Sequence, residues 1–272
     1  MKFFSTLFLT LTLMVGCESS LHAFKFPHIA NIFRRNVPAI AQRAHIGIIK
    51  LDGKINNKLA EDFIKKTNEF SRKTYIDGIL LIINSGGGSS GFSDLISLEI
   101  KALAAKKPIV VLVTNQCCSG AYQTAVSANW IIAPASAAVG SIGVVTTIEK
   151  HTNAKMNEAG YSADVTYDII HAGKYKVINY FGTAPLTEEE RAWIQEQVNA
   201  DYKIFYTIVA QQRNLALEKL TEWADGQIFN GEQALALGMI DQVGGYSDAV
   251  NALTDILQKQ NKKTYDNLVF YE

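Results

Sequence analysis

The sequence predicts an α/β fold with a mostly parallel sheet covered by helices. Two continuous apolar runs, Gly78–Ile83 and Ile109–Val113, are typical of strands that are buried on both faces. Segments with helical spacing of apolar residues lie between such runs, so strand and helix patterns alternate along the chain. The 19 glycines of the chain are concentrated beside the apolar runs, where turns are expected.

The first residues predict an export signal. Lys2 precedes an apolar stretch over residues 3–15, which spans about 20 Å as a helix and is shorter than a bilayer core of about 30 Å. Met14–Cys17 resembles a bacterial lipobox, in which Cys17 would be lipidated and become the new N-terminus. Cleavage after Ala23 and an uncleaved anchor are the alternatives. In each case we expect the body of the protein to face the bacterial cell envelope, outside the cytoplasm.

The domain organisation follows from changes in composition. The export signal is expected over residues 1–17, with 23 as the alternative end. Residues 18–44 mix basic and apolar residues with two prolines, and we expect a tether or an oligomerisation arm there. One folded domain is expected over residues 45–255. The polar run Asn261–Lys263 predicts a frayed C-terminal tail over residues 256–272.

Periodicity and capping signals place the elements of the folded domain. Strands are predicted over residues 45–51, 78–83, 109–113 and 130–133. Helices are predicted near residues 59–70, 95–103, 121–128 and 187–213. Thr187 and Glu190 have the spacing of a capping box, which opens the last of these helices.

Composition and charge make several classes of protein unlikely candidates. Lys and Arg number 26, as do Asp and Glu, so the formal net charge is +0 and there is no basic footprint for nucleic acid. Three cysteines cannot form a disulfide framework, and no Cys/His cluster has zinc spacing, so no metal site is expected. With 48% apolar and 19% charged residues, the chain is neither a disordered tail nor a membrane bundle.

A glycine-rich loop follows one predicted strand. Gly86–Gly91 matches G-x-G-x-x-G, but the next strand ends in Val113–Asn115 without the acidic residue that a dinucleotide site needs. The chain also lacks G-K-[ST], so we expect no nucleotide cofactor. The loop is then either a flexible turn or a place where backbone N–H groups meet negative charge.

A second turn carries a candidate nucleophile. Cys117–Gly120 lies between a strand and a helix, which puts Ser119 at the carboxyl edge of the sheet, where α/β proteins place their ligands. The N–H of Gly120 would point into the same space and could stabilise an oxyanion. On this segment alone, a serine that caps the helix is the commoner interpretation.

The base that would activate Ser119 is either a histidine or a lysine. A triad would need His151 or His171, and neither lies in a recognisable setting. A lysine becomes a base when burial lowers its pKa from about 10.4. Lys174 and Lys176 follow an apolar run, although most lysines in such positions are solvated surface residues.

Five segments in order along the chain match motifs of one family. They are Asn84–Gly88, Cys118–Tyr122, Gly140–Val144, Gly173–Lys176 and Asp225–Asp241. In turn they resemble the N-S-P-G-G loop, the A-S-G-G-Y nucleophile turn, G-S-[IL]-G-V, G-x-Y-K and the D-G-R-[VI]-[FY]…L-G-L-[VI]-D stretch of the signal peptide peptidase A family. That family comprises membrane-linked Ser-Lys peptidases of the S49 type with a ClpP/crotonase-like fold of repeated β-β-α units.

The resemblance implies roles for individual residues. Ser119 would be the nucleophile and Lys176 its general base, with Ser141 hydrogen-bonded to that lysine. The N–H groups of Gly87 and Gly120 would form the oxyanion hole. It further implies peptide or unfolded-protein substrates, no cofactor, and a membrane-tethered homo-oligomer whose active sites can be shared between subunits.

The leading prediction is therefore a serine endopeptidase that cuts apolar peptides, such as signal peptide remnants or misfolded envelope proteins. Gly86, Cys118 and Ala121 depart from the family pattern, which affects the expected rate and substrate preference more than the reaction type. Two alternatives remain. One is a crotonase-type acyl-CoA hydratase or isomerase, and the other is a catalytically degenerate scaffold at the membrane.

Overall fold

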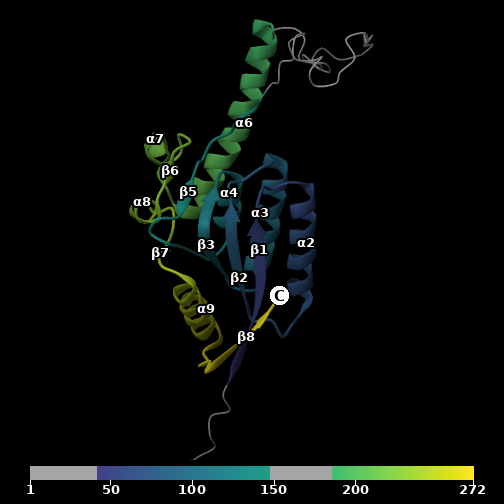
Figure 1. The fold of residues 1–272 in the computed structure, drawn as a ribbon, viewed down its shortest axis with the longest axis vertical. Coiled ribbons are helices and arrows are strands. Elements are labelled where there is room, and N and C mark those ends of the chain that lie inside the picture. The colour runs from purple at the N-terminus through teal and green to yellow at the C-terminus, as the bar shows by residue number, and fades with distance from the viewer. Residues whose placement is uncertain (1–41, 148–185) are drawn as a thin grey trace, which may run out of the picture. The chain divides into compact units, whose positions relative to one another are not determined.

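The computed structural model describes residues 42–147 and 186–272 (Figure 1). The strands are β1 (Arg43–Asp52), β2 (Gly78–Ser85), β3 (Ile109–Cys118), β4 (Trp130–Ala133), β5 (Ala138–Gly140), β6 (Ile228–Phe229), β7 (Gln242–Val243) and β8 (Asn267–Tyr271). The helices are α2 (Asn57–Arg72), α3 (Ser90–Ala104), α4 (Gly120–Ala125), α6 (Glu188–Arg213), α7 (Leu220–Trp223), α8 (Gly231–Ala236) and α9 (Tyr246–Asn261), with a 3-10 turn, η1, at Leu217–Lys219.

The described strands form one mostly parallel sheet, as the sequence predicts. Its order is β6-β5-β3-β2-β1-β8, and β4 pairs with both β3 and β7. All of these pairs are parallel except β5 with β6. Parallel strands align their carboxyl ends, so the segments that follow β2 and β3 come out at the same edge of the sheet.

Helices cover both faces of this sheet (Figure 1). Alternate residues of each strand point to opposite faces. Ile79, Leu81 and Ile83 of β2 therefore belong to the large core that includes residues of α2, α3, α4 and α6, whereas Leu80 faces α9. The second core cluster contains Leu253 and Leu257 of α9. Burial on both faces explains why the central strands read as uninterrupted apolar runs.

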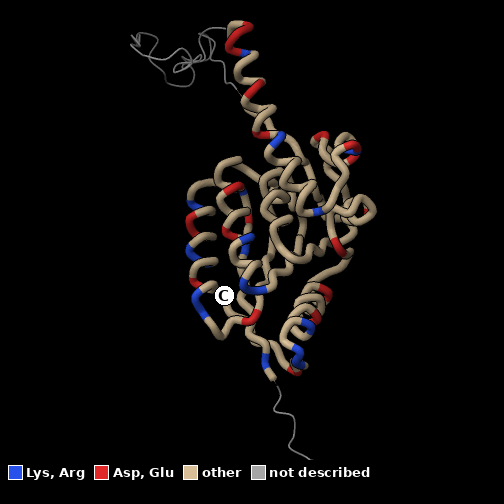
Figure 2. The backbone as a smooth tube through the Cα atoms, turned by 180° about the vertical axis from the view of Figure 1, so that it is seen from behind, with Lys and Arg blue, Asp and Glu red and all other residues tan. Residues whose placement is uncertain are grey.

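The helices begin and end close to the predicted positions. α6 starts with the predicted capping box, because the hydroxyl of Thr187 accepts from the N–H of Glu190 and the Glu190 carboxylate accepts from the N–H of Thr187. Residues of opposite charge are interspersed along α2 and α9 (Figure 2). One such pair in α2 joins Lys58 and Asp62 at 3.0 Å. In the described ranges, no helix combines the length and apolarity needed to cross a membrane.

The predicted C-terminal tail over residues 256–272 is wrong. α9 continues to Asn261, and β8 then pairs in parallel with β1, from Arg43 opposite Asn267 to Gly47 opposite Tyr271. The polar run that suggested fraying ends a helix, with Lys262 in the left-handed region at a φ of 51°. Its polarity reflects a helix terminus and a turn, after which the chain returns to the sheet.

Candidate active site

Ser119 lies on a strained turn between β3 and α4. Its φ of 52° and ψ of −131° place it in a region that residues with a side chain rarely adopt. The turn is held by a hydrogen bond of 2.7 Å from the Ser119 N–H to the carbonyl of Gly140. The Ser119 side chain makes no capping hydrogen bond to α4, so the structure does not support the helix-cap interpretation. Among the described residues, the hydroxyl is thus not engaged as a helix cap.

Close packing of α4 fixes the position of this turn. All six residues of α4 are buried, and the Tyr122 hydroxyl donates to the carbonyl of Met239 at 2.8 Å. Gly120 must be glycine, because a Cβ there would lie 2.1 Å from the hydroxyl oxygen of Ser93 in α3. The N-terminus of α4 is therefore pressed against α3, beside the loop that precedes α3.

The glycine loop after β2 packs against the same turn. Gly87 has a φ of +95°, and a Cβ there would lie 2.8 Å from the nitrogen of Gly120. At Gly88, a Cβ would lie 2.1 Å from the carbonyl oxygen of Ile55. The interpretation of this loop as a flexible turn is therefore not supported. These two glycines allow the loop to fit between Ile55 and the Ser119 turn.

The direction of the N–H groups in this loop bears on the predicted oxyanion hole. The Gly87 N–H donates to the hydroxyl of Ser85 at 3.1 Å, so it is engaged within the loop. The Ile55 N–H donates to the Gly87 carbonyl and the Ser89 N–H donates to the Ile55 carbonyl, at 2.9 and 3.0 Å. In this parallel bridge the N–H of the intervening Gly88 must point away from Ile55.

The N–H groups of Gly88 and Gly120 are consequently two candidate donors near Ser119. A Cβ built on Gly120 would lie 3.6 Å from the nitrogen of Gly88, and both glycines line the same pocket as Ser119. Gly120 opens α4, so its N–H has no acceptor within the helix. The family motif implies Gly87 as one donor, and it does not show which glycine of the loop directs its N–H toward Ser119.

The structure brings the predicted Ser141 next to this turn. Ser141 follows Gly140, whose carbonyl accepts the Ser119 N–H. It too has a positive φ, of 51°, and its N–H donates to the carbonyl of Gln227 at 2.6 Å. The antiparallel pairing of β5 with β6 positions this segment. Two serines on strained backbone therefore lie on adjoining turns.

Other predicted site residues lie outside the described residues. They are Cys17, Lys174 and Lys176, together with the alternative bases His151 and His171. Within the described ranges, no group of three or more His, Cys, Asp or Glu side chains could hold a metal ion.

Two cysteines precede Ser119, and neither is prepared to react. Burial raises the pKa of the Cys117 thiol well above its ordinary value and also raises that of Cys118. Both therefore remain protonated at neutral pH, and a thiol is a much weaker nucleophile than a thiolate. Among the side chains of this turn, the Ser119 hydroxyl is the better candidate.

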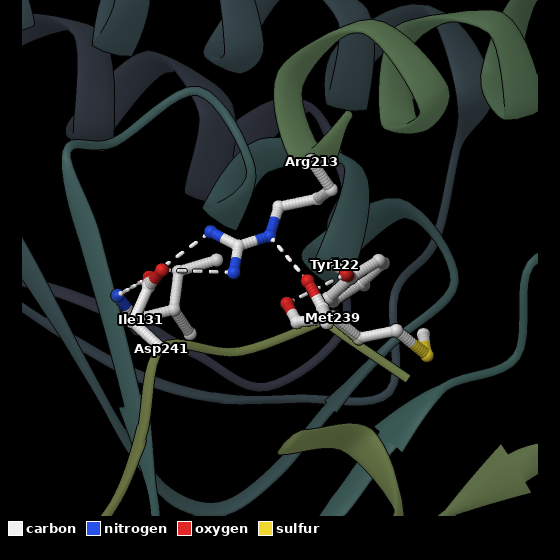
Figure 3. Close-up of polar contacts among 6 residues, drawn as sticks. Tyr122, Ile131, Arg213, Met239 and Asp241 are labelled. Carbon is white, nitrogen blue, oxygen red and sulfur yellow. Dashed lines mark hydrogen bonds and ion pairs between the residues drawn. The ribbon is translucent and has the colours of Figure 1, made fainter. Parts of the chain in front are cut away.

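A polar network joins the end of α6 to β4 and to the segment that contacts Tyr122 of α4 (Figure 3). Arg213, at the end of α6, donates to both carboxylate oxygens of Asp241 at 2.9 and 3.0 Å and to the carbonyl of Gly238. Asp241 also accepts from the N–H of Ile131 in β4 at 2.7 Å. Met239, two residues before Asp241, accepts a hydrogen bond through its carbonyl from the Tyr122 hydroxyl of α4. The network thus ties α6, β4 and α4 together.

Two hollows meet at Ser119. The first is lined by Asp94, Gln123 and Asp201, as well as Gly88 and Gly120. The second, of about 810 Å³, is lined by the glycine loop and by apolar groups such as Ile55 and Phe92. A peptide lying over Ser119 would have a hollow on either side of this residue.

The fold and the site together define an α/β protein with a partly buried serine on a turn between a strand and a helix. The model of peptidase family S49 matches residues 101–261. The chain belongs to this family.

Relatives of known sequence agree with this assignment. A protein of Methanocaldococcus jannaschii is 34% identical over 204 residues, which cover 75% of this chain and 64% of the relative. The chloroplastic serine protease SPPA of Arabidopsis thaliana is 32% identical over 220 residues, or 76% of this chain and 32% of its own. This chain therefore matches less than two thirds of either relative.

The structural neighbour confirms the predicted ClpP-like fold. A variant of ClpP1 from Listeria monocytogenes superposes with a TM-score of 0.51 at 16% identity, covering 75% of this chain and 94% of its own. At that identity the likeness concerns the fold alone.

Proposed function

We propose that the protein is a serine endopeptidase in which Ser119 is the nucleophile and a neutral Lys176 is the general base. The observation that carries the proposal is the Ser119 turn, with a positive φ, no capping bond from the side chain, and two backbone donors beside it. Family membership favours peptide hydrolysis over the acyl-CoA chemistry that shares this fold.

The proposed reaction uses few groups. The Ser119 oxygen attacks the carbonyl carbon of the scissile bond while its proton passes to the Lys176 amine. When the tetrahedral intermediate collapses, the C–N bond breaks and the proton goes to the departing amine, leaving an acyl-enzyme. Water then attacks the ester, giving up a proton to the lysine, and Ser119 is regenerated.

We assign the oxyanion hole to the N–H groups of Gly88 and Gly120. This refines the pair implied by the family motif, because the N–H of Gly87 is already directed at the Ser85 hydroxyl. Donors held by a fixed backbone stabilise developing negative charge without reorganising, and loss of one such donor typically slows catalysis about 10²- to 10³-fold. Ser141, on the adjoining turn, would hold the lysine amine.

We further propose the substrates, the membrane attachment and the assembly of the protein. Unfolded proteins and peptide remnants in the cell envelope are the proposed substrates, and Cys17 would tether the enzyme to the membrane. The ClpP-like fold is compatible with a homo-oligomer. The serine and the lysine of one active site would then come from one subunit or from two. Assembly would keep the amine away from bulk water, which favours its neutral form.

The test compares Ser119→Ala, Lys176→Ala and the neighbouring control Lys174→Ala in the full chain. Cleavage of an unfolded protein, followed by mass spectrometry, should be abolished in the first two variants and retained in the third. An acylating serine probe should label the unaltered protein at Ser119. Equal cleavage by the Lys176 variant would overturn the dyad, and absence of both labelling and cleavage would favour the degenerate scaffold.

A further inference from the structure

The pocket that adjoins Ser119 and the two backbone donors has an acidic wall. Besides two serines, Ser90 and Ser119, its polar side chains are Asp94 of α3, Gln123 of α4 and Asp201 of α6. Its volume of about 90 Å³ is several times the roughly 10–15 Å³ that one water needs, which is enough for a single side chain. The nucleophile and Gly120 form part of the wall, so the pocket adjoins the scissile bond of a bound substrate.

The two carboxylates share this space without a compensating cation among the described residues. The amide of Gln123 donates to one oxygen of Asp94, which orients that carboxylate. Burial raises the pKa of Asp94, and the negative charge of Asp201 raises it further. No Lys, Arg or His belongs to the described lining of the pocket.

The geometry points to Asp94 and Asp201 as specificity-determining residues that select a lysine or arginine side chain next to the scissile bond. This inference rests on the proposed peptidase function and deepens it by naming a substrate class. It differs from the purely apolar preference expected from the family resemblance.

The charges make a cationic side chain the favoured occupant. An apolar side chain would displace water from the carboxylates and give them no partner, which costs free energy. An acidic side chain would add a third negative charge. A lysine or arginine would instead relieve the repulsion between Asp94 and Asp201, while its methylene groups would contact the apolar remainder of the wall. Apolar residues of the substrate would still fit the second hollow beside Ile55 and Phe92.

The experiment uses the full-length protein and a set of fluorogenic peptides that share one apolar sequence. The two residues flanking the scissile bond are varied in turn among lysine, arginine, norleucine and glutamate. We expect lysine or arginine to be preferred over norleucine about tenfold in kcat/KM at one of these two positions, and glutamate to be the poorest. Equal rates for lysine and norleucine at both positions would overturn the inference.

Variants of the two carboxylates should change the selectivity. In Asp94→Asn and Asp201→Asn, the ratio of kcat/KM for lysine over norleucine should fall at least threefold. Asp201→Lys should favour glutamate, and because Asp201 is exposed on α6 this change should not disturb the fold. Asp255→Asn, on the exposed side of α9, removes the same charge elsewhere and should leave the ratio unchanged. An unaltered ratio in all three pocket variants would contradict the assignment.

The dependence of this ratio on pH provides a second readout. The titratable groups lining the described pocket are Asp94 and Asp201. The pKa of Asp94 is raised, so its carboxylate is lost as the pH falls through that raised value. The lysine-to-norleucine ratio should fall with it, because titration of the general base affects both peptides equally. A constant ratio down to pH 4 would count against the inference. Absence of Ser119-dependent cleavage of every peptide at neutral pH would instead contradict the proposed function.

Discussion

Gly88 has no room for a side chain, so a substitution there should affect both the stability of the fold and the proposed oxyanion hole. We predict that Gly88→Ala destabilises the fold by about 1–3 kcal/mol, because the added Cβ would meet the Ile55 carbonyl at 2.1 Å and the loop must move. The same movement would misdirect the proposed oxyanion donor and lower kcat/KM about 10²-fold or more. Thermal unfolding and peptide kinetics measure the two effects.

A matched control for this substitution lies three residues further on. Gly91 is exposed at the start of α3, and a Cβ there would meet nothing within 4 Å. Gly91→Ala should therefore be neutral or slightly stabilising, because alanine favours a helix more than glycine does. If both variants retained full activity and stability, the close approach of Gly88 to Ile55 would be wrong.

Single residues also show where sequence reasoning reaches its limit. Ser119 and Gly120 could be singled out only through the family motif, because on the strand-to-helix turn alone a helix-capping serine is the commoner interpretation. Gly88 could not be distinguished from Gly87, because the direction of each N–H depends on the bridge to Ile55. Nothing in the sequence pairs Asp94 with Asp201, since their helices are separated by much of the chain and only the folded structure brings them into one pocket.

At the scale of elements, the end of α6 is held by the Arg213–Asp241 pair. Their side chains are 12% and 19% exposed, so each charge is poorly solvated and depends on its partner. Asp241→Asn retains an acceptor for the Ile131 N–H but leaves the guanidinium without its counter-ion. We predict a loss of about 1–3 kcal/mol in the free energy of unfolding, together with lower activity, because the network also supports α4.

An exposed ion pair supplies the comparison for this prediction. Lys219 and Glu222 are 65% and 54% exposed and lie 3.5 Å apart. Such pairs contribute about 0–1 kcal/mol, so Glu222→Gln should scarcely change the unfolding midpoint. Chemical denaturation of both variants measures the difference. Equal midpoints would mean that the Arg213–Asp241 pair does not hold α6.

At the scale of the whole molecule, the order of elements was largely predictable and the edge of the sheet was not. The central strands are buried on both faces, so their apolar runs stand out in the sequence, and the Thr187 capping box marks α6 directly. β8 is a short edge strand that follows a polar helix end, and local composition there resembles that of a tail. Its place beside β1 depends on a contact between the two ends of the folded domain.

Removal of β8 tests that contact. Truncation after Lys263 would leave the Arg43–Gly47 half of β1 without its neighbour and would remove the hydrogen bond of 2.7 Å between the Tyr271 hydroxyl and His45. Each lost hydrogen bond costs about 0.5–1.5 kcal/mol, and apolar burial is lost as well. We therefore predict destabilisation on the order of 3 kcal/mol, measured by chemical denaturation.

The control for the truncation is deletion of Glu272 alone. This residue lies beyond β8 and makes one exposed ion pair with Lys50, with side chains 69% and 57% exposed. Its loss should cost well under about 1 kcal/mol. If the longer truncation unfolded at the same denaturant concentration as this control, the segment would be the dispensable tail that its composition suggests. A large difference would instead establish the last residues as part of the folded domain, so that tags or fusions at this end should be joined through a flexible linker.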